Sequence, residues 1–258
     1  MKLIVLVKEV PDTYGDRKLN LETGLADRGA SEAVLDEISE RALEAALTYA
    51  DANPGTEVVA LAAAPAGSVS TVRKALGMGA DRAIHVADEA LAGADIVLTA
   101  QVLAAAIKRD GFDLVISGNV STDGSGGMVP AAIAEYLEVP QLTGLSEIEI
   151  TDSKVSGTRP IDGGAQRVSA QLPAVVSITE AFPDPRFPSF KGIMAAKKKP
   201  FETVSLADLG VRADDPEVAR SIMLSIAEKP PREAGIKIVD DGEAGKDLAD
   251  FLLKNRLA

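Results

Sequence analysis

The stretch FDLVISGNVSTDGSGGMVPAAIAEYLEVP, residues 112–140, decides the fold that this sequence predicts. Leu114 to Ile116 is a short apolar run with β-branched residues, which is typical of a buried strand. Residues 117–127 then carry almost no large side chains, and residues 131–137 have helical composition. The order is therefore strand, small-residue loop and helix. This arrangement lets backbone N–H groups approach an anion at a helix N-terminus.

Polar side chains in the loop support such a site without proving it. The hydroxyls of Ser121, Thr122 and Ser125 could add donors, and Asp123 either accepts from a ribose hydroxyl or caps the turn. The loop matches neither the Gly-x-Gly-x-x-Gly fingerprint nor a Walker A loop. Two interpretations therefore stay open: a nucleotide-phosphate site, or an ordinary strand-to-helix connection.

Strands and helices alternate before this stretch. Candidate strands cover residues 3–7, 57–62 and 81–86, and candidate helices cover residues 31–52, 68–76 and 94–109, with Ser68 as a plausible N-cap. The alternation predicts an α/β fold: a parallel sheet with flanking helices, in a Rossmann-like arrangement. The connections at residues 8–13, 63–67 and 117–127 each follow a strand, so we expect them to form one crevice at one sheet edge.

The pattern changes after Pro140. Four strand-like runs separated by turn signals predict an antiparallel extension of the sheet, at residues 145–150, 155–158, 167–171 and 174–179. The proline-rich stretch from Phe182 to Pro188 cannot continue a helix or a central strand. We therefore expect a nucleotide-binding α/β domain at residues 1–182. An extended C-terminal arm at residues 183–258, with a terminal helix, would pack on a partner subunit.

Composition excludes several classes of function. The 258-residue chain has a net charge of −12, which argues against nucleic acid as the main partner. It has no cysteine, so disulfides and thiolate metal sites are excluded; this is consistent with a cytoplasmic protein. No apolar run reaches the length of a membrane span, so no membrane insertion is expected. His85 is the only histidine, and we expect it to be structural, with no catalytic or metal-binding set around it.

Two later blocks of sequence carry a family resemblance. The first is GTRPIDGGAQRV at residues 157–168 followed by LPAVVS at residues 172–177. The second runs from Glu180 to Lys199 and includes PRFPSFKGIMAAKKK at residues 185–199. With these blocks the chain resembles the beta subunit of electron-transfer flavoproteins over nearly its whole length.

The resemblance implies an electron-carrier subunit rather than an enzyme. It implies a heterodimer with an alpha subunit, an FAD held mainly by that alpha subunit, and a structural AMP in the beta subunit. Electrons would come from dehydrogenases such as the acyl-CoA dehydrogenases of fatty acid oxidation and pass to a quinone oxidoreductase. Some members of the family hold a second FAD in place of AMP and bifurcate electrons.

The resemblance also implies site residues. Carried onto this chain, the cofactor contacts are Leu6, Asp36, Glu37, Ile38, Ser39, Ala63, Gly118, Ser121, Thr122, Asp123, Gly124, Ser125, Gly126, Gly127, Met128 and Val129. The loop after Gly118 has fewer acidic residues than the family's, which favours contact with phosphate through backbone N–H groups. The family's tyrosine near the flavin aligns with Thr13, and Tyr14 follows it.

A second set of residues belongs to partner recognition. The expected contacts are Arg186, Phe187, Phe190, Ile193, Lys197, Lys198 and Lys199. We expect Phe190 to anchor the partner and Phe187 to pin the base of the loop. The lysines would steer the partner electrostatically.

Two other readings of the sequence remain open. One is a bifurcating flavoprotein subunit with FAD in the nucleotide site. The other is a stand-alone AMP- or ATP-binding protein, which leaves the arm after Pro183 unexplained.

Overall fold

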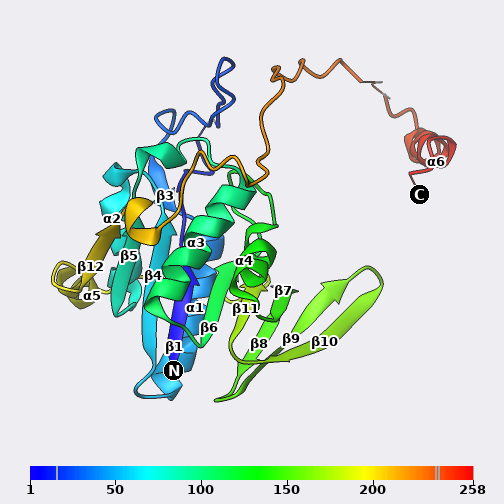
Figure 1. Cartoon of the computed structure of the whole chain (residues 1–258). Helices are drawn as coiled ribbons and strands as arrows, with labels where there is room; N and C mark the ends of the chain where they lie inside the picture. The colour runs from blue at the N-terminus through cyan, green and yellow to red at the C-terminus, as the bar shows by residue number, and fades with distance from the viewer. Residues whose placement is uncertain (16, 236, 238, 258) are drawn as a thin grey trace. The chain divides into compact units, whose positions relative to one another are not determined.

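The computed structural model describes residues 1–15, 17–235, 237 and 239–257 (Figure 1). The chain divides into two compact units, Met1–Ser225 and Ile226–Ala258. The first unit holds the sheets and five of the helices described below. The second holds one helix, α6 (Ala244–Lys254), which has no buried residue.

A seven-stranded parallel sheet forms the centre of the first unit. Its order is β12 (Phe201–Val204), β5 (Arg82–Val86), β4 (Glu57–Ala63), β1 (Lys2–Leu6), β6 (Leu114–Gly118), β11 (Ala174–Ile178) and β7 (Gln141–Leu145). The predicted α/β fold with a parallel sheet is confirmed. The first strand of the chain is also the central strand of the sheet.

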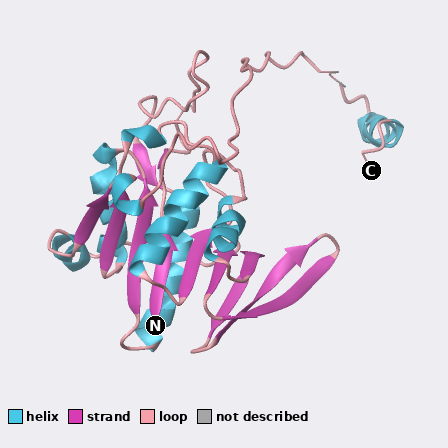
Figure 2. Cartoon of the chain, viewed as in Figure 1, coloured by secondary structure: helices cyan, strands magenta, loops and turns pink. Residues whose placement is uncertain are grey.

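Helices cover both faces of this sheet (Figure 2). The helices α1 (Glu37–Ala52) and α2 (Val69–Met78) pack on one face, and α3 (Ile96–Asp110) and α4 (Val129–Leu137) on the other. Along β1, Leu3 and Val5 are buried in the first core while Ile4 and Leu6 are buried in the second. Because strand side chains alternate between faces, an uninterrupted apolar run is what a strand covered on both sides requires.

The antiparallel part is a separate sheet. It consists of β8 (Glu147–Ile150), β9 (Lys154–Ile161) and β10 (Gly164–Gln171), in the order β10-β9-β8. The expectation that residues 174–179 extend the main sheet antiparallel was wrong, because β11 lies parallel between β6 and β7. All five residues of β11 are buried, as in a strand covered on both faces.

The first helix starts later than its apolar pattern predicted. Helix α1 begins at Glu37, because the carboxylate of Asp36 accepts from the backbone N–H of Ile38 and caps it. Residues Ala33–Leu35 form β3, which pairs antiparallel with β2 (Glu9–Pro11). Ser68 occupies the N-cap position of α2, as expected, but its side chain does not cap the helix: the hydroxyl donates instead to the carboxylate of Glu9 at 2.6 Å.

The compact unit continues past the boundary expected at residue 182. After α5 (Phe190–Ala196), the chain returns to the main sheet as β12, which pairs with β5. The expectation missed this strand because it has four residues at a sheet edge, two of them exposed, and no periodic signal. Residues 183–225 therefore belong to the first unit, and only residues 226–258 form the second.

Three short 3-10 helices complete the described elements: η1 (Ala66–Ser68), η2 (Glu89–Leu91) and η3 (Ala207–Leu209). Among the described residues, no helix has both the length and the hydropathy needed to cross a bilayer.

Candidate functional site

Three neighbouring parallel strands end at the same edge of the sheet. Leu6, Ala63 and Gly118 are the last residues of β1, β4 and β6. The connections that follow are in contact: Lys8 Nζ lies 3.2 Å from Ser121 Oγ, and Ser68 donates to Glu9. The three connections that we expected to meet are therefore brought together, at the carboxyl ends of strands where α/β sheets bind ligands.

Asp36 ties the small-residue loop (residues 118–129) to the start of α1. Its carboxylate oxygens accept from the backbone N–H groups of Ile38 at 3.3 Å and Thr122 at 3.0 Å. Burial raises the pKa of this carboxyl, and the two N–H donors only partly oppose that effect. The side chain of Asp36 therefore positions the loop through a hydrogen bond from the loop's backbone.

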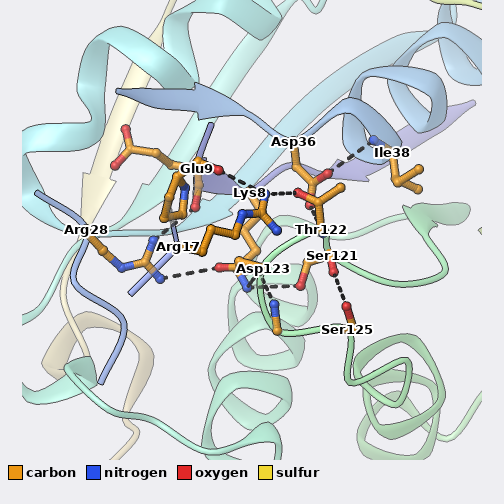
Figure 3. Close-up of polar contacts among 12 residues, drawn as sticks. Lys8, Glu9, Arg17, Arg28, Asp36, Ile38, Ser121, Thr122, Asp123 and Ser125 are labelled. Atoms are coloured by element: carbon orange, nitrogen blue, oxygen red, sulfur yellow. Dashed lines mark hydrogen bonds and ion pairs between the residues drawn. The ribbon is translucent and has the colours of Figure 1, made fainter. Parts of the chain in front are cut away.

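Lys8 and Asp123 form an ion pair at the tip of the loop (Figure 3). The ammonium nitrogen of Lys8 lies 2.7 Å from the carboxylate of Asp123. Burial would raise the pKa of Asp123, but the hydrogen bonds from Lys8, Ser121 and Gly124 and the charge of Lys8 together leave the pKa below its ordinary value. Asp123 also accepts from the backbone N–H of Gly124 at 2.6 Å. This bond caps the turn, which is one of the two roles predicted for Asp123.

Two arginines reach the same loop from residues 12–32, the excursion between β2 and β3 (Figure 3). Arg17 Nη2 donates to Thr122 Oγ1 at 3.1 Å, and Arg28 Nη2 lies 3.8 Å from the carboxylate of Asp123. With Lys8, three cationic side chains from two parts of the chain contact the loop.

The second half of the loop presents backbone donors. The N–H groups of Gly126, Gly127 and Met128 donate to no acceptor among the residues that the structure describes. They precede α4, whose first-turn N–H groups have no partner within the helix. Ser125 and Gly127 have φ values of 49° and 66°, so the chain turns sharply here. Free amides, a helix N-terminus and nearby cations fit the chemistry of a phosphate group.

The other expected cofactor residues take varied positions. Ile38 and Ser39 are buried, and a Cβ on Gly118 would lie 2.5 Å from Ile38 Cγ2, so this glycine lets the strand end approach α1 closely. Glu37 is exposed and lines a separate cleft with Arg41 and Lys74. Of residues 36–39, only Asp36 forms a hydrogen bond to the loop in the described structure.

Arg186 fixes the base of the segment at residues 183–200, which we call the recognition segment. Its guanidinium donates to both carboxylate oxygens of Glu44 at 2.8 Å and lies 2.9 Å from Asp51. Its backbone N–H donates to Glu44 as well, at 2.9 Å. Burial would raise the pKa of Glu44, but these bonds to Arg186 lower it below its ordinary value.

The two phenylalanines of the recognition segment are both exposed. Phe187 is 94% exposed and Phe190 is 82% exposed, with Ile193 half-exposed on the next turn of α5. The expectation that Phe187 pins the loop base was wrong, because Arg186 does so. Behind them the segment packs tightly: a Cβ on Gly192 would lie 2.4 Å from the carbonyl oxygen of Gly77 in α2.

The three lysines at the end of the segment differ from one another. Lys197 and Lys198 are exposed. The ammonium of Lys199 donates to the carbonyls of Leu76, Gly79 and Ala80, at 3.1, 3.1 and 2.6 Å, and burial lowers its pKa. Lys199 therefore supplies hydrogen-bond donors to the carbonyl groups at the C-terminal end of α2. The run of three lysines in the sequence did not predict this role.

The described residues contain no cluster of His, Asp or Glu side chains that could hold a metal ion. His85 is fully buried in β5, with Nε2 3.0 Å from the carbonyl oxygen of Ala64 and its ring edge-to-face with Phe201. These contacts support the structural role expected for it.

Sequence reasoning missed Lys8, Arg17 and Arg28 as site residues. Lys8 carried a usable signal, because it lies just beyond a predicted strand end at the expected crevice. Arg17 and Arg28 carried no such signal, because only the folded excursion brings them to the loop. Arg17 and Thr122, for example, are 105 positions apart in the sequence.

Comparison with known proteins gives one consistent result. A family model described as "Electron transfer flavoprotein domain" matches residues 23–209. The chain is 46% identical over 262 residues to "Electron transfer flavoprotein subunit beta" of Mycobacterium tuberculosis, covering 99% of this chain and 98% of that protein. The protein of the same name from Bacillus subtilis is 32% identical, covering 98% and 97%. The "Caffeyl-CoA reductase-Etf complex subunit CarD" of Acetobacterium woodii is 36% identical over 212 residues, covering 82% and 80%.

Proposed function

The chain belongs to the electron transfer flavoprotein family as a beta subunit, and from this premise we propose that it forms a heterodimer with an alpha subunit that holds the FAD. In this proposal the beta subunit holds one AMP with a structural role. It contributes no bond-making chemistry of its own. A bound flavin would supply the electron transfer.

The observation that carries the nucleotide proposal is the contact set at the loop. The carboxylate of Asp36 accepts from the backbone N–H of Thr122. The N–H groups of Gly126, Gly127 and Met128, which have no acceptor among the described residues, precede α4. A phosphate can accept from such donors while the helix dipole favours its charge. The residues of this chain would thus bind and orient the nucleotide through backbone more than through side chains.

Exposed apolar side chains on the excursion support an alpha-subunit contact there. Tyr14 is 99% exposed, and Leu19, Leu21 and Leu25 are 55%, 55% and 41% exposed. An apolar group this size beside the sheet edge is better explained by a covering partner than by solvent. The second compact unit supports the same partner, because α6 presents Leu248, Phe251 and Leu253 without burying them.

The recognition segment supports docking of dehydrogenases. Exposed Phe187 and Phe190 are held on a base fixed by Arg186, and large aromatic side chains dominate many transient interfaces. We propose that electrons arrive from dehydrogenases such as acyl-CoA dehydrogenases and leave to a quinone oxidoreductase.

A second candidate function is electron bifurcation with FAD in the nucleotide site. The observation that favours it is the similarity to a protein whose name places it in a caffeyl-CoA reductase–Etf complex. The N–H groups of the loop that lack an acceptor among the described residues would donate to a phosphate of FAD as well as to that of AMP, so the geometry does not separate the two.

Extraction of the co-purified nucleotides from the heterodimer tests these proposals. AMP and one FAD per heterodimer are expected. Two FAD molecules per heterodimer would replace the AMP proposal with the bifurcating one. Nucleotide without flavin, from a chain that recruits no alpha subunit, would contradict the electron-carrier function altogether.

A further inference from the structure

The excursion contains a hairpin whose two arms carry one arginine each. Leu19 and Ala26 form an antiparallel bridge, and the N–H of Asp27 donates to the carbonyl of Lys18 at 2.9 Å. This register, continued outward by one residue, places Arg17 opposite Arg28. The two guanidinium groups therefore approach the small-residue loop from facing positions of one hairpin.

The hairpin is anchored at its root. The strands β2 and β3 pair below it, and the N–H of Asp12 donates to the carbonyl of Glu32 at 2.8 Å. A Cβ on Gly15 would lie 2.5 Å from Ser31 Cβ, so the two arms are in close contact there. On the far side, Gly24 packs on Met223 and Gly93 packs on Leu25. The arginines are thus held over the loop by backbone pairing and packing.

Both arginines are also held by the carbonyls of β2. Arg17 Nη2 donates to the carbonyl of Pro11 at 3.0 Å, and Arg28 Nη1 donates to that of Glu9 at 3.2 Å. Such bonds orient a guanidinium while leaving its other N–H groups for an anion.

The cations share a single ion-pair partner. Lys8 and Arg28 both pair with Asp123, at 2.7 and 3.8 Å, and Arg17 donates only to neutral oxygens within the described residues. The carboxylate of Asp36 also interacts electrostatically with Lys8, but Arg17 has no ion-pair partner among the described residues. The N–H groups of Gly126 to Met128, later in the same loop, have no protein acceptor in the described structure either. An added anion between the two sets would satisfy both.

We infer that Arg17 and Arg28, with Lys8, form a clamp for the phosphate of a nucleoside 5′-monophosphate. The inference rests on the proposed nucleotide site and names side chains for it that the family resemblance did not. A phosphate monoester carries more charge than either phosphate of the FAD diester, so the clamp favours AMP over FAD. Charge-assisted hydrogen bonds from arginine give it strength and orientation.

Binding of AMP and adenosine to the full chain, freed of co-purified nucleotide, tests the clamp by calorimetry. Arg17→Gln and Arg28→Gln are each expected to weaken AMP binding about tenfold, the loss of one exposed charge-assisted bond. Adenosine binding should stay unchanged because it lacks the phosphate. Lys18→Gln is the matched control: Lys18 is an exposed residue of the same hairpin, and its loss changes the net charge equally.

The outcomes separate the clamp from the nucleotide site itself. AMP affinities of Arg17→Gln and Arg28→Gln equal to that of Lys18→Gln would overturn the clamp while leaving the site in place. Equal losses for AMP and adenosine would also overturn it, because they indicate a distorted hairpin. A loss confined to FAD, titrated in parallel, would overturn the monophosphate assignment. A wild-type chain that binds neither AMP nor adenosine would refute both proposals.

Discussion

The Nε and Nη2 atoms of Arg186 each lie 2.8 Å from one carboxylate oxygen of Glu44, which joins the recognition segment to α1 through a two-pronged ion pair. The backbone N–H of Arg186 adds a third bond to the same carboxylate. Glu44, whose side chain is itself mostly buried, thus positions the recognition segment.

Glu44→Gln is expected to lower the free energy of unfolding by about 1–2 kcal/mol, since the pair is partly buried and loses a charge. Asp51→Asn, which removes the more exposed partner of Arg186, should cost less than about 0.5 kcal/mol. Urea unfolding at pH 7 measures both. Equal effects of the two substitutions would contradict the positioning role of Glu44.

The same pair predicts a dependence on pH. Because the folded state lowers the pKa of Glu44 below 4.5, the pair stabilises the fold above that pH. That contribution is lost as pH falls through the folded-state pKa. The stability difference between wild type and Glu44→Gln should therefore shrink below about pH 4.5 and be constant near neutrality.

Lys199→Met is expected to destabilise the protein by about 1–3 kcal/mol, because three carbonyls at the end of α2 lose a charged donor. Lys197→Met and Lys198→Met are the matched controls and should stay within about 0.5 kcal/mol of wild type. Thermal unfolding provides the comparison. Similar melting temperatures for all three variants would contradict the structural role of Lys199 and leave it only the steering role expected from the sequence.

Phe190→Ala is expected to slow reduction of the heterodimer by its dehydrogenase about tenfold or more, since it removes an exposed aromatic anchor. The flavin spectrum, AMP content and reduction by dithionite should be unchanged. Stopped-flow reduction with the physiological donor is the measurement, and Phe187→Ala shows whether the anchor is shared. An unaltered rate, or loss of flavin, would make Phe190 a structural residue.

Gly126→Leu is expected to abolish AMP retention with the sheet intact. A Cβ at this position already lies 3.2 Å from Ile96 Cδ1, so a leucine side chain would displace the loop backbone that is proposed to hold the anion. Gly118→Ala is a contrasting variant, because its Cβ would strike α1 and lower stability instead. Stoichiometric AMP in purified Gly126→Leu would show that the loop does not bind the nucleotide.

A chain ending at Ser225 is expected to keep its sheet and its nucleotide and to lose the alpha subunit. This truncation removes the second compact unit and spares β12, which a deletion after Pro183 would remove as well. Gel filtration after co-expression with the alpha subunit measures assembly, and circular dichroism checks the fold. An intact heterodimer from the truncated chain would exclude α6 as an essential contact.

The sequence predicted the main sheet because its inner strands are covered on both faces. Such strands leave uninterrupted apolar runs, as in Leu3 to Val7 and Leu114 to Ile116, and the small-residue loop then marks the ligand edge. The same reasoning misjudged β11, since an apolar run does not state the direction of its strand. It missed β12, because Glu202 and Thr203 are exposed and interrupt the apolar run that marks the inner strands.

The candidate site was predictable only in its backbone. Residues 118–129 could be found because small residues and a following helix leave a local signature. The side chains that complete the site depend on the register of a distant hairpin, which brings Arg17 to Thr122. The different tasks of Lys197 and Lys199 likewise depend on which carbonyls lie within reach after folding.

The recognition segment joins β11 to β12, the sixth and first positions of the sheet order, and so passes over five inter-strand spacings, about 24 Å. A segment that is held by strands at both ends and tied near its start by the Arg186–Glu44 pair has little conformational freedom left to lose on binding. In the proposed docking of a dehydrogenase, the length of this connection would therefore matter as well as the exposed Phe187 and Phe190.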